Sequence, residues 1–284
     1  MRHAVLGAGG IGGLIAAALA HAGVPVVVLL REETLAAYAG RMTVESVALG
    51  DFDVDVPAAS TLDREIDVLW IAIKATQLAR ALDLAPPERV GAATVIPMMN
   101  GIDHVDLLRE RYRNVVAGAI RVESERVAPS HIRQPSPFLR VELAGGGAVA
   151  DDLRGAGIEC RVRDDERSLL WEKLAFLAPV ALATTALDAP LGDVRDDARY
   201  KACCGETIAV ARAEGATIDE AALSTLQGNA PAEMRSSMQK DVERGRSPEL
   251  HAIAGPVLRG GRRHGIAVPG TEELVRLVEA RLSR

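Results

Sequence analysis

A glycine-rich turn lies within the first 13 residues of the chain, directly after the short apolar run His3–Leu6. Its spacing is Gly7-x-Gly9-x-x-Gly12. In such a turn the first glycine permits a tight bend, the second lets a diphosphate approach the backbone, and the third lets a helix pack closely on a strand. Leu14–Ala22 predicts that helix, and the continuous apolar run Val24–Leu30 predicts a second strand that is buried on both faces. The resulting βαβ unit predicts a dinucleotide site rather than a purely structural turn. The residues expected to line it are Gly7, Ala8, Gly9, Gly10, Ile11 and Gly12.

The rest of the N-terminal half supplies further strand candidates. Three apolar runs, Val68–Ile73, Ala93–Pro97 and Val115–Ala119, are separated by helical or loop stretches. Strands that alternate with helices predict a largely parallel sheet with helices on both faces. From Val122 to Val149, prolines and a run of three glycines indicate hairpins instead, and Cys160–Val162 is the last strand expected in this half.

The character of the sequence changes again near Arg163, after which long segments rich in Ala, Leu, Glu and Arg are punctuated by glycines. The pattern predicts an α/β protein with an N-terminal Rossmann-type domain, built on a doubly wound and mainly parallel sheet, and an all-helical C-terminal domain. We expect the domains to span residues 1–163 and 164–284. The first would bind the dinucleotide, and the second would bind the substrate and form the interface of a homodimer.

Composition excludes several classes of partner. The chain has 33 Lys and Arg against 39 Asp and Glu, and a net charge of −6 argues against nucleic acid, whose phosphates favour a basic surface. Leu14–Leu30 contains a histidine, a glycine and a proline, and Leu174–Leu187 is shorter than the roughly 20 residues of a membrane span. Three cysteines and six histidines form no ligand cluster, so we expect no metal. An N-terminus that opens on a strand-like run predicts no signal peptide and a cytoplasmic protein.

The end of the second predicted strand bears on the choice of coenzyme. An acidic residue there usually binds the ribose 2′-hydroxyl of NAD, whereas an arginine accommodates the 2′-phosphate of NADP. Here the strand runs into Arg31, which favours NADPH because a guanidinium pairs bidentately with a phosphate. In the alternative, Arg31 is a solvated residue paired with Glu32 or Glu33, and either glutamate binds a ribose instead.

Two polar residues follow the next two predicted strands. Lys74 comes after Val68–Ile73, and Asn100 comes after Ala93–Pro97 with Gly101 permitting a turn. The carboxyl ends of parallel strands face the ligand crevice of an open sheet. Each residue taken alone is more often an ordinary loop residue, but their shared position at this edge of the sheet makes Lys74 and Asn100 candidates to bind the coenzyme or the substrate.

Three residues of the C-terminal half are candidates for chemistry. Lys173 is the one cation in the apolar stretch Leu169–Leu177, where it could donate a proton to a carbonyl oxygen. Ser237 could bind a carboxylate, and Glu249 could accept a hydrogen bond from a substrate hydroxyl. The structural alternatives are a snorkelling or ion-paired lysine, a helix-capping serine and a glutamate in a first helical turn.

Taken together, these motifs resemble the ketopantoate reductase (2-dehydropantoate 2-reductase) family over nearly the whole chain. The spacing from the Ser-Ser-Met stretch to the Pro-Glu pair is the most specific part. The segments that carry the resemblance are residues 7–12, Arg31, 73–75, Asn100-Gly101, 171–174, 236–241, 248–250 and 264–269.

The resemblance implies that NADPH reduces a small 2-oxo acid between a Rossmann domain and a helical domain, as in pantothenate biosynthesis. It also implies roles for individual residues. Lys173 would be the general acid, Glu249 would hold the lysine or a substrate hydroxyl, and Ser237 would bind the substrate carboxylate. Lys74 and Asn100 would bind both coenzyme and substrate.

The chain departs from the family pattern at three positions where asparagine is expected. These positions hold Leu177, Ala181 and Met234. Each substitution removes hydrogen-bonding capacity from a pocket that pairs with a polar substrate. Two alternatives to ketopantoate reduction therefore stay open. One is an oxidoreductase that acts on a different, less polar carbonyl compound, and the other is an NADP-binding sensor without catalysis.

Overall fold

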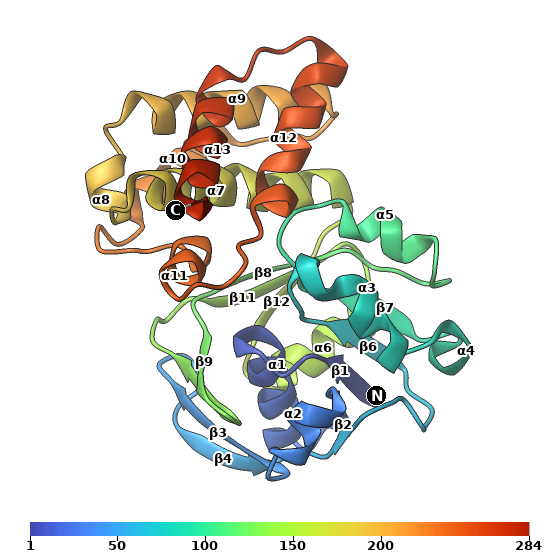
Figure 1. Ribbon diagram of the computed structural model, residues 1–284. Coiled ribbons are helices and arrows are strands. Elements are labelled where there is room, and N and C mark those ends of the chain that lie inside the picture. The colour runs from blue at the N-terminus through green and yellow to red at the C-terminus, as the bar shows by residue number, and fades with distance from the viewer. Residues whose placement is uncertain (284) are drawn as a thin grey trace. The chain divides into compact units, whose positions relative to one another are not determined.

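The structure is a computed structural model that describes residues 1–283, and the chain forms two compact units (Figure 1). The first unit contains Met1–Met99 and His104–Glu166. The second contains Asn100–Asp103 and the described residues from Arg167 onward. Each unit has a hydrophobic core of its own, so the two are described separately.

The first unit is built on a five-stranded sheet in which all neighbouring strands are parallel, with the order β5-β2-β1-β6-β7. The strands are β1 (His3–Leu6), β2 (Val26–Leu29), β5 (Ala58–Ala59), β6 (Val68–Ile71) and β7 (Thr94–Pro97). Every residue of β1, β2 and β6 is buried, as their continuous apolar runs predict. The expected parallel sheet is therefore confirmed.

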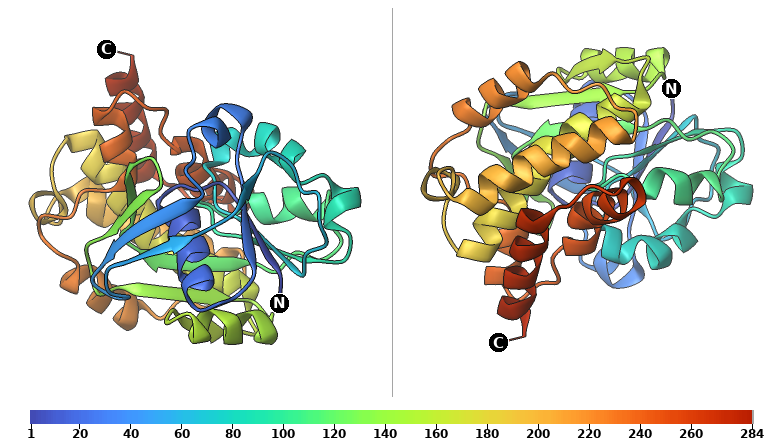
Figure 2. Two further views of the ribbon diagram at one scale, coloured as in Figure 1. Left: turned by 90° about the horizontal axis from the view of Figure 1, so that it is seen from below. Right: turned by 90° about the horizontal axis from the view of Figure 1, so that it is seen from above.

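Helices cover both faces of this sheet (Figure 2). Val5 packs in one cluster with α1 (Gly10–His21), while Ala4 and Leu6 point to the other face. That other face packs against α3 (Leu78–Ala81), α4 (Pro87–Val90), α5 (His104–Arg109) and the short 3-10 turns Ala75–Gln77 and Leu82–Leu84. Alternate residues of one strand thus bury themselves on opposite sides, which is the doubly wound arrangement that the sequence predicts.

A second sheet lies on the far side of α1, with the order β4-β3-β10-β9. Its strands are β3 (Arg41–Ser46), β4 (Phe52–Asp55), β9 (Glu125–Ala128) and β10 (His131–Gln134). Gly13 of α1 lies so close to β10 that an added Cβ would be 2.6 Å from Ile132 Cδ1. The antiparallel β9–β10 pair confirms the hairpin expected in this region, whereas the β3–β4 hairpin and the short α2 (Glu32–Ala36) were not predicted.

The third sheet has the order β12-β11-β8 and corrects one prediction. It contains β8 (Gly118–Val122), β11 (Leu139–Leu143) and β12 (Glu159–Val162), and α6 (Gly147–Gly155) begins at the last of the three consecutive glycines. The strand expected at Val115–Ala119 is wrong in its place in the parallel sheet, because only Val115 makes a parallel bridge, to Val95, and Gly118 and Ala119 already belong to β8 of the third sheet. The chain then turns away and pairs antiparallel with β11.

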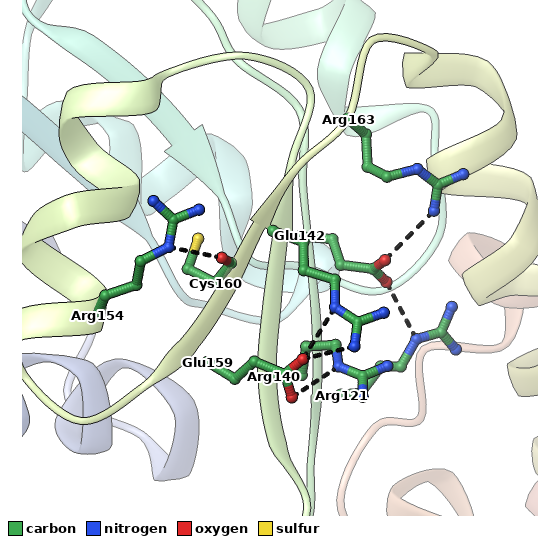
Figure 3. A network of polar contacts seen from close by, with 8 residues as sticks. Arg121, Arg140, Glu142, Arg154, Glu159, Cys160 and Arg163 are labelled. Atoms are coloured by element: carbon green, nitrogen blue, oxygen red, sulfur yellow. Dashed lines mark hydrogen bonds and ion pairs between the residues drawn. The ribbon is translucent and has the colours of Figure 1, made fainter.

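Charged side chains cover one face of this third sheet (Figure 3). The carboxylate of Glu142 accepts hydrogen bonds of 3.3 Å from both Arg121 Nε and Arg163 Nη1. Beside it, Arg140 Nε lies 3.0 Å from Glu159 Oε2. The two carboxylates lie among arginines from all three strands and from the residue after β12, which limits the repulsion between those cations.

The second unit is helical in its described residues, which confirms the predicted class of the C-terminal half. The helices are α7 (Glu166–Leu187), α8 (Leu191–Val194), α9 (Ala198–Ala213), α10 (Glu220–Asn229), α11 (Ser237–Glu243), α12 (Leu250–His264) and α13 (Pro269–Leu282). Helix α9 packs against both α12 and α13 (Figures 1 and 2).

Helix α7 is 22 residues long and apolar enough, by length and composition alone, to cross a membrane. The shorter span Leu174–Leu187 expected from the sequence is therefore an underestimate, because Pro179 lies inside the helix and does not end it. However, 67% of its most apolar window is buried in the protein, and Leu174, Ala178 and Leu182 belong to the core of the helical unit. This burial is typical of a core helix.

Candidate functional site

The glycine turn between β1 and α1 is closed by contacts that only glycine permits. Gly7 has a φ of +97°, and an added Cβ would lie 2.5 Å from Ile73 Cγ2 and 2.9 Å from the carbonyl oxygen of Ala72. At Gly12, an added Cβ would lie 2.0 Å from the carbonyl oxygen of Gly7. The first and third glycines of the motif are therefore required by backbone conformation and by close packing.

Gly9 is different, because an added Cβ there would meet no atom within 4 Å. Gly9 is the N-cap residue of the 12-residue helix α1. Because glycine has no side chain, no side chain caps the first N–H groups of this helix. Unpaired N–H groups and the positive end of the helix dipole favour a phosphate. The open space at Gly9 therefore fits the diphosphate of a dinucleotide. The neighbouring Ala8 and Ile11 are half-buried and pack on the core.

Ser124 also contacts this turn, and it was missed from the sequence. Its hydroxyl donates a 2.9 Å hydrogen bond to the carbonyl oxygen of Gly10. An added Cβ on Gly10 would lie 2.4 Å from the carbonyl oxygen of Ser124, so the connection between β8 and β9 lies directly against the first turn of α1. No local pattern marks Ser124, because the two residues are 114 positions apart.

A surface cavity of about 340 Å³ borders the turn. Ala8 lines it beside Leu30, the residue after β2. Its other lining residues come from α2 and the segment after it and from the β9–β10 hairpin: Thr34, Ala37, Tyr38, Arg126, Val127, Ala128, Pro129 and Ser130. The cavity therefore lies beside both the phosphate turn and the strand end that usually binds the adenosine ribose.

Arg31 lies next to this cavity in sequence, as the N-cap residue of α2. Its side chain is exposed, and within the described chain no ion pair joins it to Glu32 or Glu33. Arg31 is not among the residues that line the cavity. Its expected contact with a 2′-phosphate stays a prediction.

Lys74 lies where the sequence predicts, just beyond the carboxyl end of β6. It is half-buried and is the N-cap residue of the 3-10 turn Ala75–Gln77. The preceding residues, Ala72 and Ile73, are those that approach Gly7 most closely. The segment that carries Lys74 therefore packs against the glycine turn.

Asn100 belongs to the helical unit together with the short stretch Asn100–Asp103. Its Nδ2 donates a hydrogen bond of 2.9 Å to Oε2 of Glu249, the N-cap residue of α12. Gly101 has a φ of +83°, and an added Cβ would lie 2.3 Å from the carbonyl oxygen of Ala252. Asp103 pairs with Arg259 of the same helix. This stretch is thus fitted to α12, and two predicted site residues, Asn100 and Glu249, are brought into contact.

Lys173 is half-buried on α7 in the same unit. Leu177 and Ala181 follow it at intervals of four residues, so the three side chains share one face of the helix. Ala181 is buried in the core cluster of the unit, and Leu177 packs against that cluster. The face that continues from the lysine is therefore apolar.

The two adjacent serines before α11 have different environments. Ser236 is the N-cap residue, accepts from the backbone N–H of Gln239, and lies 2.8 Å from the hydroxyl of Thr184 on α7. Ser237 is exposed, and its hydroxyl has no hydrogen-bond partner among the described residues. The capping role is therefore filled by Ser236, and the Ser237 hydroxyl is accessible to a ligand. Met234 packs against the core cluster nearby.

The two buried cysteines are poor candidates for a catalytic thiol, and the described residues contain no metal-binding cluster. Burial raises the pKa of Cys160 to about 11 and that of Cys203 to about 12. Both thiols therefore stay protonated near neutral pH and are weak nucleophiles. Residues 1–283 contain no group of three or more His, Cys, Asp or Glu side chains that could hold a metal ion.

Two family models match the chain. Residues 3–141 match the model described as ketopantoate reductase PanE/ApbA, and residues 165–282 match its C-terminal counterpart. The chain is 29% identical to the 2-dehydropantoate 2-reductase of Mycobacterium tuberculosis, over 98% of this chain and 96% of that protein.

Solved structures give the same result for the fold. A PanE/ApbA family ketopantoate reductase from Ralstonia eutropha superposes with a TM-score of 0.89 at 27% identity, covering 100% of this chain and 99% of the other. A ketopantoate reductase from Staphylococcus aureus, described as dimeric, superposes with a TM-score of 0.81 at 19% identity, covering 100% and 99%.

Proposed function

Because the chain belongs to the ketopantoate reductase family, we propose that it reduces a small 2-oxo acid with NADPH, with ketopantoate as the first candidate substrate. Members of this family are NADPH-dependent oxidoreductases that act on a C=O or CH–OH group, so the expected enzyme class and coenzyme are confirmed. The observation that carries the proposal is the glycine turn, in which Gly7 and Gly12 are packed tight and Gly9 is left open beside the start of α1.

The residues that would hold NADPH come from the first unit. The turn 7–12 and the first N–H groups of α1 bind the diphosphate, Arg31 binds the 2′-phosphate, and Lys74 binds from the segment after β6. When bound, NADPH supplies the hydride that reduces the substrate carbonyl.

The residues that would handle the substrate come from the helical unit. The ammonium group of Lys173 donates a proton to the carbonyl oxygen of the substrate as that oxygen gains negative charge. The Glu249 carboxylate, held by the Asn100 amide, orients the lysine or a substrate hydroxyl. The exposed Ser237 hydroxyl donates to the substrate carboxylate.

A second candidate function is reduction of a less polar 2-oxo acid or related carbonyl compound. Leu177, one helical turn beyond Lys173 on the same face of α7, favours it, because this partly exposed side chain offers a substrate no hydrogen bond. A site without hydrogen-bonding groups for a polar substrate has little selectivity for that substrate over an apolar analogue.

The test is NADPH oxidation by the purified protein with ketopantoate and a series of 2-oxo acids that differ in side-chain polarity. The highest kcat/KM for ketopantoate supports the first candidate, and the highest kcat/KM for an apolar branched 2-oxo acid supports the second. Tight NADPH binding without turnover of any member contradicts both and supports an NADP-binding sensor.

We further propose that the protein acts in the cytoplasm as a homodimer. A dimer is described for the S. aureus relative, and the helical domain is the expected interface. Sedimentation equilibrium of the full chain tests this, because a monomer at micromolar concentration would contradict it.

A further inference from the structure

Only one of the ten residues that line the 340 Å³ cavity is charged, and it is Arg126 of β9. The other lining side chains are alanines, Leu30, Val127, a proline, Tyr38 and two small hydroxyl residues. The hydroxyl of Tyr38 already donates to the carbonyl oxygen of Val56 at 2.7 Å. The cavity therefore offers an apolar lining with a single cation, which suits a flat base that carries a nearby anionic group.

Arg126 has no ion pair within the described part of the chain, and its side chain is exposed. Other arginines of this sheet differ, because Arg133 pairs with Glu45 and Arg41 pairs with Asp53 and Asp55. A guanidinium without a carboxylate partner keeps its donors available for a planar oxyanion.

The backbone of Arg126 is placed firmly relative to the glycine turn. In the β9–β10 pair, Arg126 is the register partner of Ile132, whose side chain packs against Gly13 of α1. On the same connection, Ser124 donates to the carbonyl oxygen of Gly10. Two contacts therefore fix the strand that carries Arg126 against the helix that begins at the turn.

We propose that Arg126 is a second specificity-determining residue for the coenzyme and that, together with Arg31, it binds the 2′-phosphate of NADPH at the edge of this cavity. The inference rests on the proposed function. Arg31 reaches the phosphate from the end of β2, and Arg126 reaches it from the β9–β10 hairpin, outside the βαβ unit that usually selects the coenzyme. A dianionic phosphate forms charge-assisted hydrogen bonds with both guanidinium groups, whereas the neutral 2′-hydroxyl of NADH gains little binding energy from them.

The experiment measures equilibrium binding of NADPH, NADH and 2′,5′-ADP to the full chain and to Arg126→Ala, Arg31→Ala and the double variant. Each single variant should lose about tenfold in NADPH affinity, on the scale of one charge-assisted hydrogen bond, with much smaller changes for NADH. The affinity for 2′,5′-ADP should fall in parallel with that for NADPH. Arg113→Ala, which removes an exposed arginine that does not line the cavity, controls for net charge.

Two results would overturn the inference while leaving the proposed function intact. One is an unchanged ratio of NADPH to NADH affinity in Arg126→Ala, and the other is an equal loss in Arg113→Ala. Failure of the wild-type protein to bind NADPH would contradict the proposed function itself. Thermal unfolding of each variant without ligand shows whether a lost affinity reflects lost folding.

Discussion

The Asn100 amide donates a 2.9 Å hydrogen bond to the Glu249 carboxylate although 149 positions separate the two residues. Glu249 is buried, with an exposed fraction of 8%, and it begins helix α12. A buried carboxylate depends strongly on its hydrogen-bond donors, because burial removes its hydration. The pair therefore ties the stretch Asn100–Asp103 to the start of α12 within the helical unit.

Replacing Asn100 with Ala should destabilise the protein by about 1.5–3 kcal/mol, the range for a hydrogen bond to a charged group. Urea unfolding of the full chain measures the change. Asn114→Ala is a matched control, since that amide donates at the same 2.9 Å to the neutral hydroxyl of Thr94 in an exposed position. Equal losses in the two variants would show that Asn100 has no special role.

Replacing Lys173 with Ala should lower turnover by about 10²–10⁴-fold, the usual scale for a general acid, while NADPH still binds. Steady-state NADPH oxidation and direct coenzyme titration measure the two effects. Lys201→Ala is the control, because that lysine is exposed on α9 and pairs with Asp196. Undiminished turnover in the Lys173 variant would remove this residue from the mechanism.

Alanine substitutions at Gly9 and Gly12 should separate binding from folding. Gly9→Ala has room for its methyl group, so it should cost less than about 1 kcal/mol as an N-cap change but weaken NADPH binding about tenfold or more. Gly12→Ala would place Cβ against the Gly7 carbonyl, so it should destabilise the protein by about 1–3 kcal/mol or more. Thermal unfolding and coenzyme titration are the measurements. Wild-type affinity in Gly9→Ala would mean that the diphosphate does not lie over this residue.

The stability of the first unit should depend on pH through His3. Trp70 Nε1 donates to His3 Nδ1 at 2.9 Å, and His3 Nε2 lies 2.9 Å from Asp152, so the ring is neutral with its proton on Nε2. Burial lowers the pKa of His3, and this effect outweighs the opposite influence of Asp152. Above about pH 6.5 the ring is neutral in both the folded and the unfolded chain. Below that value the unfolded chain binds the proton first, so stability falls by at most about 1.4 kcal/mol per pH unit until the folded-state pKa is passed.

The comparison with His3→Gln isolates this contribution. Urea unfolding of both proteins at pH 5 and pH 7.5 should show the wild-type protein losing more stability than the variant at the lower pH. The hydrogen bonds from His3 and the N-terminal ammonium group lower the pKa of Asp152 although burial opposes them, so its contribution is lost only below about pH 4. His251→Gln, at an exposed position, serves as control. Parallel pH profiles for wild type and His3→Gln would contradict the prediction.

The parts of the fold that the sequence predicted have strong local signals. The β1–α1–β2 unit combines two apolar runs with three spaced glycines, and β6 and β7 are also continuous apolar runs. The β3–β4 hairpin was missed because neither strand is a continuous apolar run: β3 alternates between exposed and buried residues, and β4 has no buried residue and contains two aspartates. At Val115, apolar character predicted a strand but could not show that the chain leaves the sheet after one bridge.

The sequence singled out individual candidate residues but not the contacts that the fold makes between them. Local context identified Glu249 and Asn100 separately, but their hydrogen bond depends on tertiary packing. Ser124 and Arg126 lie in a region without a motif, and only the folded hairpin brings them to the glycine turn and the cavity. The adjacent serines before α11 needed the structure to show which of them caps the helix.

The helical unit is discontinuous in the chain, because residues 100–103 belong to it and the chain then returns to the first unit until Glu166. A protein fragment beginning at Arg167 would lack the Asn100 amide that contacts Glu249, the Gly101 turn against Ala252 and the Asp103 partner of Arg259. Limited proteolysis at the 166–167 junction should therefore yield a C-terminal piece that unfolds more readily than the same residues in the intact protein. During synthesis, residues 100–103 are made long before α12. The helical unit can therefore be completed only if this tetrapeptide is still accessible when α12 forms.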